Sequence, residues 1–407
     1  MEDNIVYSAG KRGTSVRSDC WVEFEKHSSG GRVVEIKSKV GRLYGDKISA
    51  LVDEVLEFYG IDNCVLRIED SGALDFVMAA RLESAIKRAG SGSGKDFLLP
   101  AKYGHITPQK TRLRRSRLYL PGNEPKFYIN AGLHKPDGII LDLEDSVHHS
   151  EKDAARILVR NALRAVDFYG AERMVRINQL PLGLEDLRAV IPNGVELVLI
   201  PKCEIPHEVE LIDDEIFRIK QEYNIKYPIL LMPIIESAKG VANAQAIAAA
   251  SDNICALTIG LEDFSADLGV ERTLEGKESF YARSVIINTA KAAGIQAIDS
   301  VFSDVEDTQG LINSVIEAKG LGFEGKGCIH PRQIDVIHKA FAPSEKETEK
   351  AKKIVLAFED AQSRGLGVIS LGSKMIDPPV VKRALHTVDL AILNGLLPED
   401  WRNNENG

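Results

Sequence analysis

The chain has 407 residues, of which 44% are hydrophobic, so it can bury more than one core, and we expect one large domain and one small one. The formal net charge of −9 argues against a cationic surface for nucleic acid or for an anionic membrane. The N-terminus lacks the apolar run of a signal peptide, and no later stretch approaches the roughly 20 apolar residues of a membrane span.

The cysteines are odd in number, widely scattered and without a CxxC pair, which argues against a disulfide framework and against a zinc site. Reduced thiols are typical of a cytoplasmic protein, and we therefore predict a soluble protein of the cytoplasm. The five positions are Cys20, Cys64, Cys203, Cys255 and Cys328.

The first 90 residues predict a small α+β domain. The segments VEFE, RVVEIK and CVLRIED are short, alternating and rich in β-branched residues, as strands are. Residues 45–60 and 74–89 have apolar residues at helical spacing. A flexible RAGSGSGK segment and the basic TRLRRSR follow, so residues 91–115 are interpreted as a linker.

From residue 116 to 343, short apolar runs alternate with amphipathic helical segments, which is typical of a parallel sheet with crossover helices. Eight such runs predict a closed (β/α)8 barrel, in which the C-terminal ends of the strands line the active site. A doubly wound open sheet is the alternative. The runs are RLYLP, DGIILDLE, RMVRIN, VELVLIPK, PILLMPIIE, ALTIG, AIDSVFSD and KGCIHP.

The residues after the barrel exceed what closure of a barrel needs. A long polar helix is expected from about residue 344 to 364, and the tail VISLGSKMIDPPVVKRALHTVDLAILNG follows it. We therefore interpret 344–407 as a helical extension, for which a neighbouring subunit is one packing partner.

Two carboxylates are predicted at the mouths of adjacent strands. Glu236 ends the fifth run and Asp263 follows the sixth. Adjacent strands lie about 4.8 Å apart, so both side chains can reach one ion. Two protein oxygens, with the other positions left to water and substrate, are typical of a magnesium site. The alternative, solvated carboxylates at loop starts, is less favoured because the barrel places both on the face used for chemistry.

Two cations are predicted at the same mouth, Arg176 at the end of the third run and Lys202 at the end of the fourth. An arginine fork suits a carboxylate or a developing enolate better than a lysine does. The alternative is that both cations form ion pairs with the acidic residues that end the second run, which are Asp142, Glu144 and Asp145.

The turn at residues 121–123, PGN, offers backbone groups to an anion, with Arg117 and Lys126 flanking it. Together with Arg176 and Lys202, these are our candidate groups for binding the substrate or coenzyme A. His330 precedes a proline at a strand end, where a hydrogen-bonded structural residue is more common than a catalytic one.

The barrel segment resembles the β subunit of citrate lyase and the related malyl-CoA and citramalyl-CoA lyases of the HpcH/HpaI aldolase-like family. The resemblance implies a (β/α)8 lyase in which Glu236 and Asp263 bind Mg²⁺ and Arg176 binds the substrate. It implies a homotrimer or hexamer in which Asp377 of the MID motif enters the active site of a neighbouring subunit. The motifs that carry it are SRLYLPGNEPKF, DGIILDLEDSV, VRIN, PKCE, IESAKG, GLEDFSADLG, GKGCIHPRQI and SKMIDPPVVKRA.

The first domain resembles the γ subunit of citrate lyase, an acyl carrier protein, through SDCWVEFE, EIKSKVGRLYGDKI and DSGALDFVMAARLESAIKRA. In that family a serine bears a covalent phosphoribosyl-dephospho-CoA arm. If Asp19 fixes the register, Arg17 occupies the place of that serine. The adjacent Ser18 and the earlier Ser15 are then the candidate attachment residues.

Three functions follow as hypotheses. In the first, the chain is a citrate lyase γ–β fusion, an oxo-acid lyase that cleaves a citryl thioester to oxaloacetate and an acetyl thioester and needs a separate CoA-transferase α subunit. In the second, the carrier domain carries no arm and the barrel cleaves free citramalyl-CoA or malyl-CoA. In the third, the chain is a non-catalytic scaffold, which the combination of Arg176, Glu236, Asp263 and Asp377 disfavours.

Overall fold

The computed structural model of the chain describes residues 5–92, 94–103, 107–363, 369–371 and 374–402. Its contacts divide the chain into two compact units. The first contains the chain up to residue 305 together with 321–334, and the second contains 306–320 together with the chain from 335 onward.

The first unit begins with a small α+β domain, as predicted. Its four-stranded sheet has the order β1-β2-β4-β3, in which only the β3–β4 pair is parallel. Strand β1 was missed by the sequence analysis because YSAG is short and lacks a pattern of apolar alternation. The elements are β1 (Tyr7–Gly10), β2 (Cys20–Lys26), β3 (Arg32–Ser38), α1 (Gly41–Phe58), β4 (Cys64–Asp70) and α2 (Asp75–Arg88).

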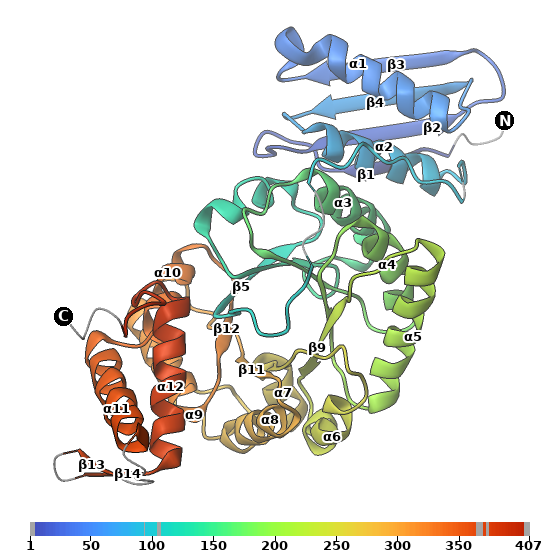
Figure 1. The fold of residues 1–407 in the computed structure, drawn as a ribbon. Helices are drawn as coiled ribbons and strands as arrows, with labels where there is room; N and C mark the ends of the chain where they lie inside the picture. Colours follow the sequence, from blue (N-terminus) through green and yellow to red (C-terminus); the bar gives the residue numbers. More distant parts are fainter. Residues whose placement is uncertain (1–4, 93, 104–106, 364–368, 372–373, 403–407) are drawn as a thin grey trace. The chain divides into compact units, whose positions relative to one another are not determined.

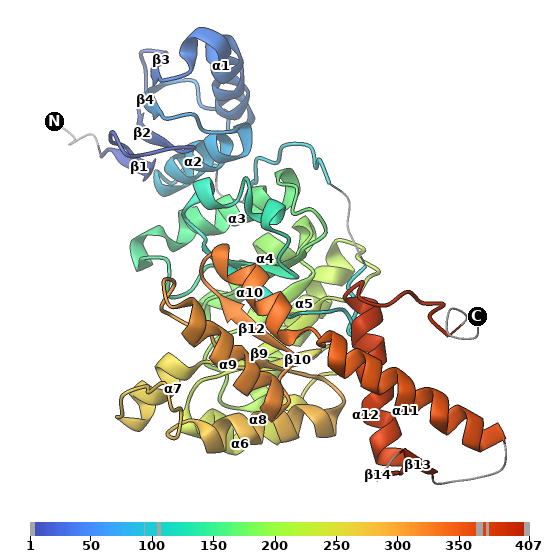
Figure 2. The same ribbon diagram turned by 90° about the vertical axis from the view of Figure 1, so that its left-hand side faces the viewer.

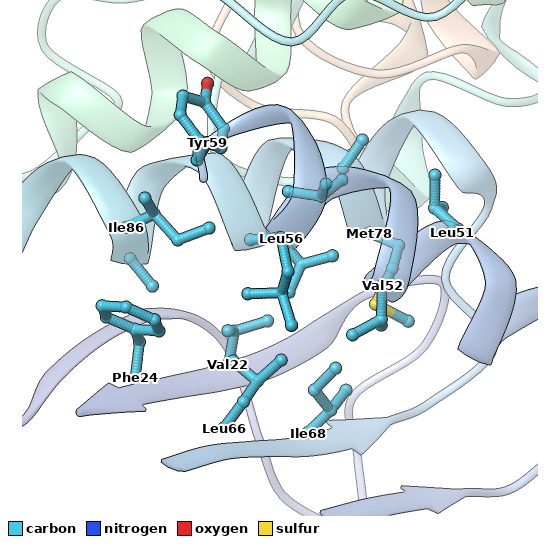
Figure 3. Packing of buried hydrophobic residues seen from close by; sticks show 14 of the residues in the cluster. Val22, Phe24, Leu51, Val52, Leu56, Tyr59, Leu66, Ile68, Met78 and Ile86 are labelled. Atoms are coloured by element: carbon cyan, nitrogen blue, oxygen red, sulfur yellow. The ribbon is translucent and has the colours of Figure 1, made fainter. Parts of the chain in front are cut away.

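One face of this sheet packs against its two helices (Figure 3). Along β2, buried residues alternate with less buried ones, so every second side chain enters the core. Each large apolar side chain buried in this way contributes about 1.5–3 kcal/mol. The core includes Val22, Phe24, Leu66 and Ile68 of the sheet, Leu51, Val52 and Leu56 of α1, and Met78 and Ile86 of α2.

Eight parallel strands then close into a barrel in the order β10-β11-β12-β5-β6-β7-β8-β9. Pairing of β12 with β5 completes the closure, so the open-sheet alternative is wrong and the predicted (β/α)8 barrel is confirmed. The strands are β5 (Ser116–Pro121), β6 (Gly138–Asp142), β7 (Glu172–Arg176), β8 (Leu197–Ile200), β9 (Leu230–Ile235), β10 (Ala256–Ile259), β11 (Gln296–Asp299) and β12 (Gly325–Cys328).

Helices surround these strands (Figure 1). Because the strands are covered on both faces, they are nearly all buried and their sequences form continuous apolar runs. Short 3₁₀ turns lie at Pro125–Phe127 (η1), Ala131–His134 (η2), His149–Glu151 (η3) and Ile191–Asn193 (η4). The helices of this unit are α3 (Lys152–Ala165), α4 (Leu182–Val190), α5 (Pro206–Glu222), α6 (Ala238–Ala248), α7 (Leu261–Leu268) and α8 (Phe280–Ala293).

The second unit contains the C-terminal helices. In Figure 2, α11 and α12 lie side by side, and a hydrophobic cluster that includes Ile354, Val388 and Trp401 joins them. The predicted long helix is confirmed as α11, and residue 364, its expected end, lies outside the described residues. The elements, of which α9 and α10 have their residues in 321–334 in the first unit, are α9 (Thr308–Leu321), α10 (Arg332–Phe341), α11 (Glu345–Ser363), β13 (Ile369–Leu371), β14 (Lys374–Ile376) and α12 (Pro378–Leu393).

Two bulk properties agree with the sequence analysis. All five cysteines are buried free thiols, without disulfide bonds. Across the residues that the structure describes, no helix combines the length and the apolar character that crossing a membrane requires.

Candidate active site

A cavity of about 460 Å³ opens at the C-terminal ends of the barrel strands. Its lining includes Tyr119 of β5, Asp142 of β6, Arg176 of β7, Glu236 directly after β9, and Asp263 in the first turn of α7. This is the face on which barrel enzymes perform chemistry. The structure therefore brings four candidate site residues from the sequence, Arg117, Arg176, Glu236 and Asp263, to one cavity.

Glu236 lines this cavity and is only 5% exposed. Burial and the neighbouring Asp263 raise its pKa to about 7, against the hydrogen bond that the Lys202 backbone N–H donates to Oε1 at 2.7 Å. Gly260, directly after β10, makes room for this carboxylate, because an added Cβ would collide with Glu236 Oε2. The Glu236 carboxylate is thus held close to a second carboxylate, that of Asp263.

Asp263 faces the same cavity from the start of α7, with its side chain 43% exposed. Within the described residues, no three acidic, histidine or cysteine side chains cluster as a complete metal cage. Two carboxylates that converge on a partly open cavity fit a hard cation that keeps water and substrate as its other ligands. The chemistry of this donor pair therefore suits magnesium.

Arg176 is held in place by the acidic residues that follow β6. Its Nε and Nη2 donate to the two oxygens of Asp142 at 2.6 and 2.7 Å, and its Nη1 lies 2.8 Å from Glu144 Oε2. Burial acts to lower the pKa of Arg176, but the hydrogen bonds that it donates to Asp142 outweigh burial and hold that pKa above its ordinary value. The ion pairing considered as an alternative is therefore present, and the guanidinium lines the cavity as well.

Lys202 forms the alternative ion pairs too. Its Nζ lies 3.3 Å from Glu144, 3.4 Å from Asp145 and 3.6 Å from Asp263, and it is absent from the described lining of the cavity. Its left-handed backbone, with φ of 46°, directs the N–H to Glu236. Sequence reasoning missed this backbone role, because nothing in PKCE indicates a left-handed residue.

The other predicted binding residues lie in different surroundings. Arg117, expected beside the 121–123 turn, is buried inside the barrel and lines the cavity. Lys126 pairs with Glu124 at 3.4 Å, lies over the Phe127 ring and is not among the described lining residues. His330 Nδ1 accepts a hydrogen bond from the Arg332 backbone N–H at 3.2 Å, which agrees with the structural interpretation.

Asp377 belongs to the second unit, where it is the N-cap of α12. Its Oδ1 accepts a hydrogen bond from the Val380 N–H at 3.2 Å. An aspartate satisfies an otherwise unpaired N–H of the first helical turn in this position.

The candidate attachment residues precede β2, which begins at Cys20. Ser15 is exposed, and Ser18 is partly buried with a left-handed φ of 55°. The next residue, Asp19, is buried and accepts two hydrogen bonds of 3.0 Å from Arg81. Arg81 also donates to the backbone oxygen of Asn123, at 3.2 Å, in the turn that follows β5.

The small domain and the barrel share a charged interface. Arg160 of α3 donates to both oxygens of Glu83 of α2 at 2.9 and 2.7 Å, and both residues are buried. Arg88 of α2 donates to both oxygens of Asp153 at 2.7 and 2.6 Å. Two-point arginine–carboxylate pairs fix orientation as well as distance, so this interface has a defined geometry.

Comparison with known proteins agrees with this geometry. Residues 115–331 match the model of the HpcH/HpaI aldolase/citrate lyase family. The chain is 40% identical over 295 residues to citrate lyase subunit beta of Leuconostoc mesenteroides subsp. cremoris, which covers 71% of this chain and 97% of that protein. The chain belongs to the HpcH/HpaI aldolase/citrate lyase family. Its barrel is a citrate lyase β-like carbon–carbon lyase domain, and the protein is an enzyme of the oxo-acid lyase class.

Other family members are also similar. The chain is 33% identical over 338 residues to the mitochondrial citramalyl-CoA lyase of Homo sapiens, which covers 77% of this chain and 98% of that protein. Among solved structures, CitE of Mycobacterium tuberculosis in complex with magnesium, acetoacetate and coenzyme A is 28% identical with a TM-score of 0.58, covering 70% of this chain and 99% of that chain.

The N-terminal domain of this family member is carrier-like. Residues 9–89 match an acyl carrier model described as the malonate decarboxylase delta subunit. This confirms the predicted fusion of a carrier-like domain with a citrate lyase β-like domain.

Proposed function

We propose that the protein is a magnesium-dependent lyase that cleaves a citryl thioester to oxaloacetate and an acetyl thioester, with the acyl group held on the fused carrier domain. The observation that carries the proposal is the convergence of Arg176, Glu236 and Asp263 on one cavity at the C-terminal face of the barrel. The citrate lyase β relative at 40% identity and the carrier match at residues 9–89 support the choice of substrate.

Glu236 and Asp263 would hold the magnesium ion. The ion supplies Lewis-acid polarisation of the substrate's hydroxyl and carboxylate oxygens when it is bound. Two features support this role. Gly260 leaves space for the Glu236 carboxylate. Asp263 contributes to the raised pKa of Glu236, which indicates repulsion between the two carboxylates that a divalent cation would relieve. The relative CitE is described as a magnesium complex.

Arg176 stabilises the negative charge that develops as the carbon–carbon bond breaks. The leaving fragment is a thioester enolate, and a guanidinium oriented in advance by Asp142 and Glu144 interacts more strongly with that charge than with the neutral thioester. Because the guanidinium is already fixed, little reorganisation is needed when the bond breaks.

Asp377 of a neighbouring subunit exchanges a proton with the enolate carbon, as general acid in cleavage and general base in condensation. This role requires a homotrimer or hexamer, in which the C-terminal extension reaches an adjacent barrel. The Asp377 carboxylate accepts a hydrogen bond from the start of α12, which gives it a defined position in its own unit.

We further propose that Ser18 carries a phosphoribosyl-dephospho-CoA arm, with Ser15 as the second attachment candidate. The contacts from Asp19 through Arg81 to Asn123 support Ser18, because they link the residue next to Ser18 to the turn whose Pro121 lines the cavity. A CoA-transferase α subunit must then supply the citryl group, and Lys126 remains a proposed contact for the arm.

A second function is favoured by Arg17, which occupies the expected position of the modified serine. In that case the carrier domain is unmodified, and the barrel cleaves free citramalyl-CoA or malyl-CoA. The similarity to a citramalyl-CoA lyase of Homo sapiens supports this alternative.

The test is the intact mass of the protein purified from its native host, followed by peptide mapping of residues 1–31. We expect extra mass on Ser18 that matches a CoA-like arm, together with Mg²⁺-dependent release of oxaloacetate from the citryl-loaded protein. An unmodified serine in a host that modifies other carriers, with cleavage of free citramalyl-CoA or malyl-CoA, would establish the second function. Absence of carbon–carbon cleavage with every thioester would refute both.

A further inference from the structure

Arg117 is a buried cation inside the barrel that has only weak acceptors. It is 1% exposed, and its Nη1 donates to Met232 Sδ at 3.0 Å. Its Nη2 donates to Thr258 Oγ1 at 3.1 Å and to the Asp299 backbone oxygen at 3.4 Å. Its Nε–H finds no acceptor among the described residues. A thioether, a hydroxyl and a distant carbonyl are poor partners for a guanidinium with five donors.

The nearby Arg114 is a buried arginine with a structural role, and it can be compared with Arg117. Arg114 is 0% exposed, and Glu172 accepts two hydrogen bonds of 2.7 Å from it. Arg117, in contrast, forms no ion pair with any carboxylate in the described part of the chain. A buried charge without a counter-charge is costly, so a residue of this kind calls for a functional explanation. Burial also lowers the pKa of Arg117.

Arg117 and its partner Thr258 both line the cavity that contains Glu236 and Asp263. Thr258 lies two residues before Gly260, and Gly260 contacts the Glu236 carboxylate. Two residues of an extended strand span about 6.5 Å, so Thr258 and Glu236 line the cavity at levels about that far apart. The carboxyl carbons of a four-carbon diacid are three bonds of about 1.5 Å apart, and their oxygens extend further at each end. Such a diacid can therefore contact the Glu236 level and the Arg117 level together.

We propose that Arg117, assisted by Thr258, binds the second carboxylate of the substrate, so that the enzyme selects a hydroxy-acid thioester whose oxo-acid product is a dicarboxylate. The inference rests on the proposed lyase function and deepens it. A guanidinium binds a carboxylate at two points, and a site built for a charged group rejects analogues that lack it. Substrates whose product is a monocarboxylic oxo-acid leave Arg117 without a counter-charge.

The test uses two stable 2-hydroxy acids that differ in the second carboxylate, malate and lactate. Their binding to the full-length protein is measured by calorimetry in the presence of Mg²⁺. We expect the wild-type protein to bind malate at least tenfold more tightly than lactate. Arg117→Met should remove this preference by weakening malate binding alone, and Arg117→Lys, which keeps the charge but loses the two-point contact, should retain part of it.

Thermal unfolding separates this role from a structural one. Arg114→Met, the matched control, should lower Tm because it strands the Glu172 carboxylate, whereas Arg117→Met should leave Tm unchanged or raise it. Equal binding of the two acids by the wild type, or equal weakening of both in Arg117→Met, would overturn the inference. If thioester cleavage persists in that case, the proposed lyase function stands; if the protein neither binds these acids nor cleaves any thioester, both proposals fail.

Discussion

Arg176 and Asp142 are register partners at the C-terminal ends of the adjacent strands β7 and β6, and they are joined by two hydrogen bonds of 2.6 and 2.7 Å. The barrel pairing therefore sets both the position and the plane of the guanidinium. Burial alone would raise the pKa of Asp142, but the hydrogen bonds that Arg176 donates hold this pKa below its ordinary value. The pair therefore stays ionised at neutral pH.

Asp142→Asn should lower kcat by about tenfold or more, because an amide cannot accept both guanidinium hydrogen bonds and Arg176 loses its fixed plane. Steady-state kinetics at saturating Mg²⁺ provide the measurement. The matched control is Glu185→Gln, which breaks an exposed pair with Arg156 outside the described cavity lining and should leave kcat unchanged. A similar kcat for wild type and Asp142→Asn would contradict the positioning role.

Glu236→Gln and Asp263→Asn should each abolish or greatly weaken magnesium binding, measured by titration calorimetry with MgCl2. Glutamine retains an oxygen that can accept the Lys202 N–H, so the loop should keep its conformation while the charge is lost. Glu204→Gln is the control, since Glu204 pairs with Lys239 and Ser237 rather than lining the cavity. Unchanged magnesium affinity in both site variants would remove these residues from the proposed metal site.

Asp377→Asn should abolish turnover while magnesium binding and folding persist. Asparagine caps a helix as well as aspartate does, so the hydrogen bond from the Val380 N–H can be kept. The carboxyl group that would give and take the proton is lost. Circular dichroism and calorimetry check the fold and the metal. Normal turnover in this variant would refute the assignment.

Contribution of Asp377 from a neighbouring subunit can be tested by complementation. Neither Asp377→Asn nor Glu236→Gln should be active alone, but mixed oligomers would contain sites with an intact barrel and an intact neighbouring tail. We expect mixing to restore part of the activity. Mixed oligomers that stay inactive would place the aspartate outside the neighbour's site.

Glu196 gives a prediction for the pH dependence of stability. Burial raises its pKa to about 7 from the ordinary 4.5. The folded state therefore binds the carboxyl proton of Glu196 more tightly than the unfolded state does. The stability that protonated Glu196 contributes is complete below pH 4.5 and is lost as the pH rises through about 7. Glu196→Gln should therefore raise the free energy of unfolding at pH 8 by roughly 2 kcal/mol and change it little at pH 4.5.

The measurement for Glu196 is urea unfolding at both pH values. Glutamine retains an acceptor for the Arg173 N–H, which now donates to Glu196 at 3.0 Å. Equal effects of the substitution at the two pH values would show that ionisation of Glu196 does not lower the stability at pH 8.

Arg160→Met should destabilise the protein by about 1–3 kcal/mol, because Glu83 loses its two-point partner and keeps Lys87, at 2.7 Å, as its charged contact. The double variant Arg160→Met/Glu83→Met should recover most of this loss, since apolar pairs can replace a buried ion pair. Chemical unfolding followed by circular dichroism measures both. A small effect of the single substitution would mean that this pair contributes little to the domain interface.

Much of the fold and part of the site could be predicted from the sequence. Eight β-branched apolar runs, each ending in polar residues, are a local pattern that favours a parallel α/β fold, and the pairing of β12 with β5 decided that the sheet closes. Because strand ends share one face of a barrel, the positions of Arg176, Glu236 and Asp263 in their runs were sufficient to bring them together. Strand β1 was missed because four residues carry too little pattern.

The sequence by itself thus determined the order of the elements and the chemical groups at the strand ends. Only the tertiary structure decided which face each residue of a strand presents: SRLYLP is buried on both faces, so no alternation of polarity reveals that Arg117 enters the barrel. The same holds for Lys202, whose role depends on a left-handed backbone and on an acceptor 34 residues away. Contacts between distant residues create these environments, and local patterns cannot encode them.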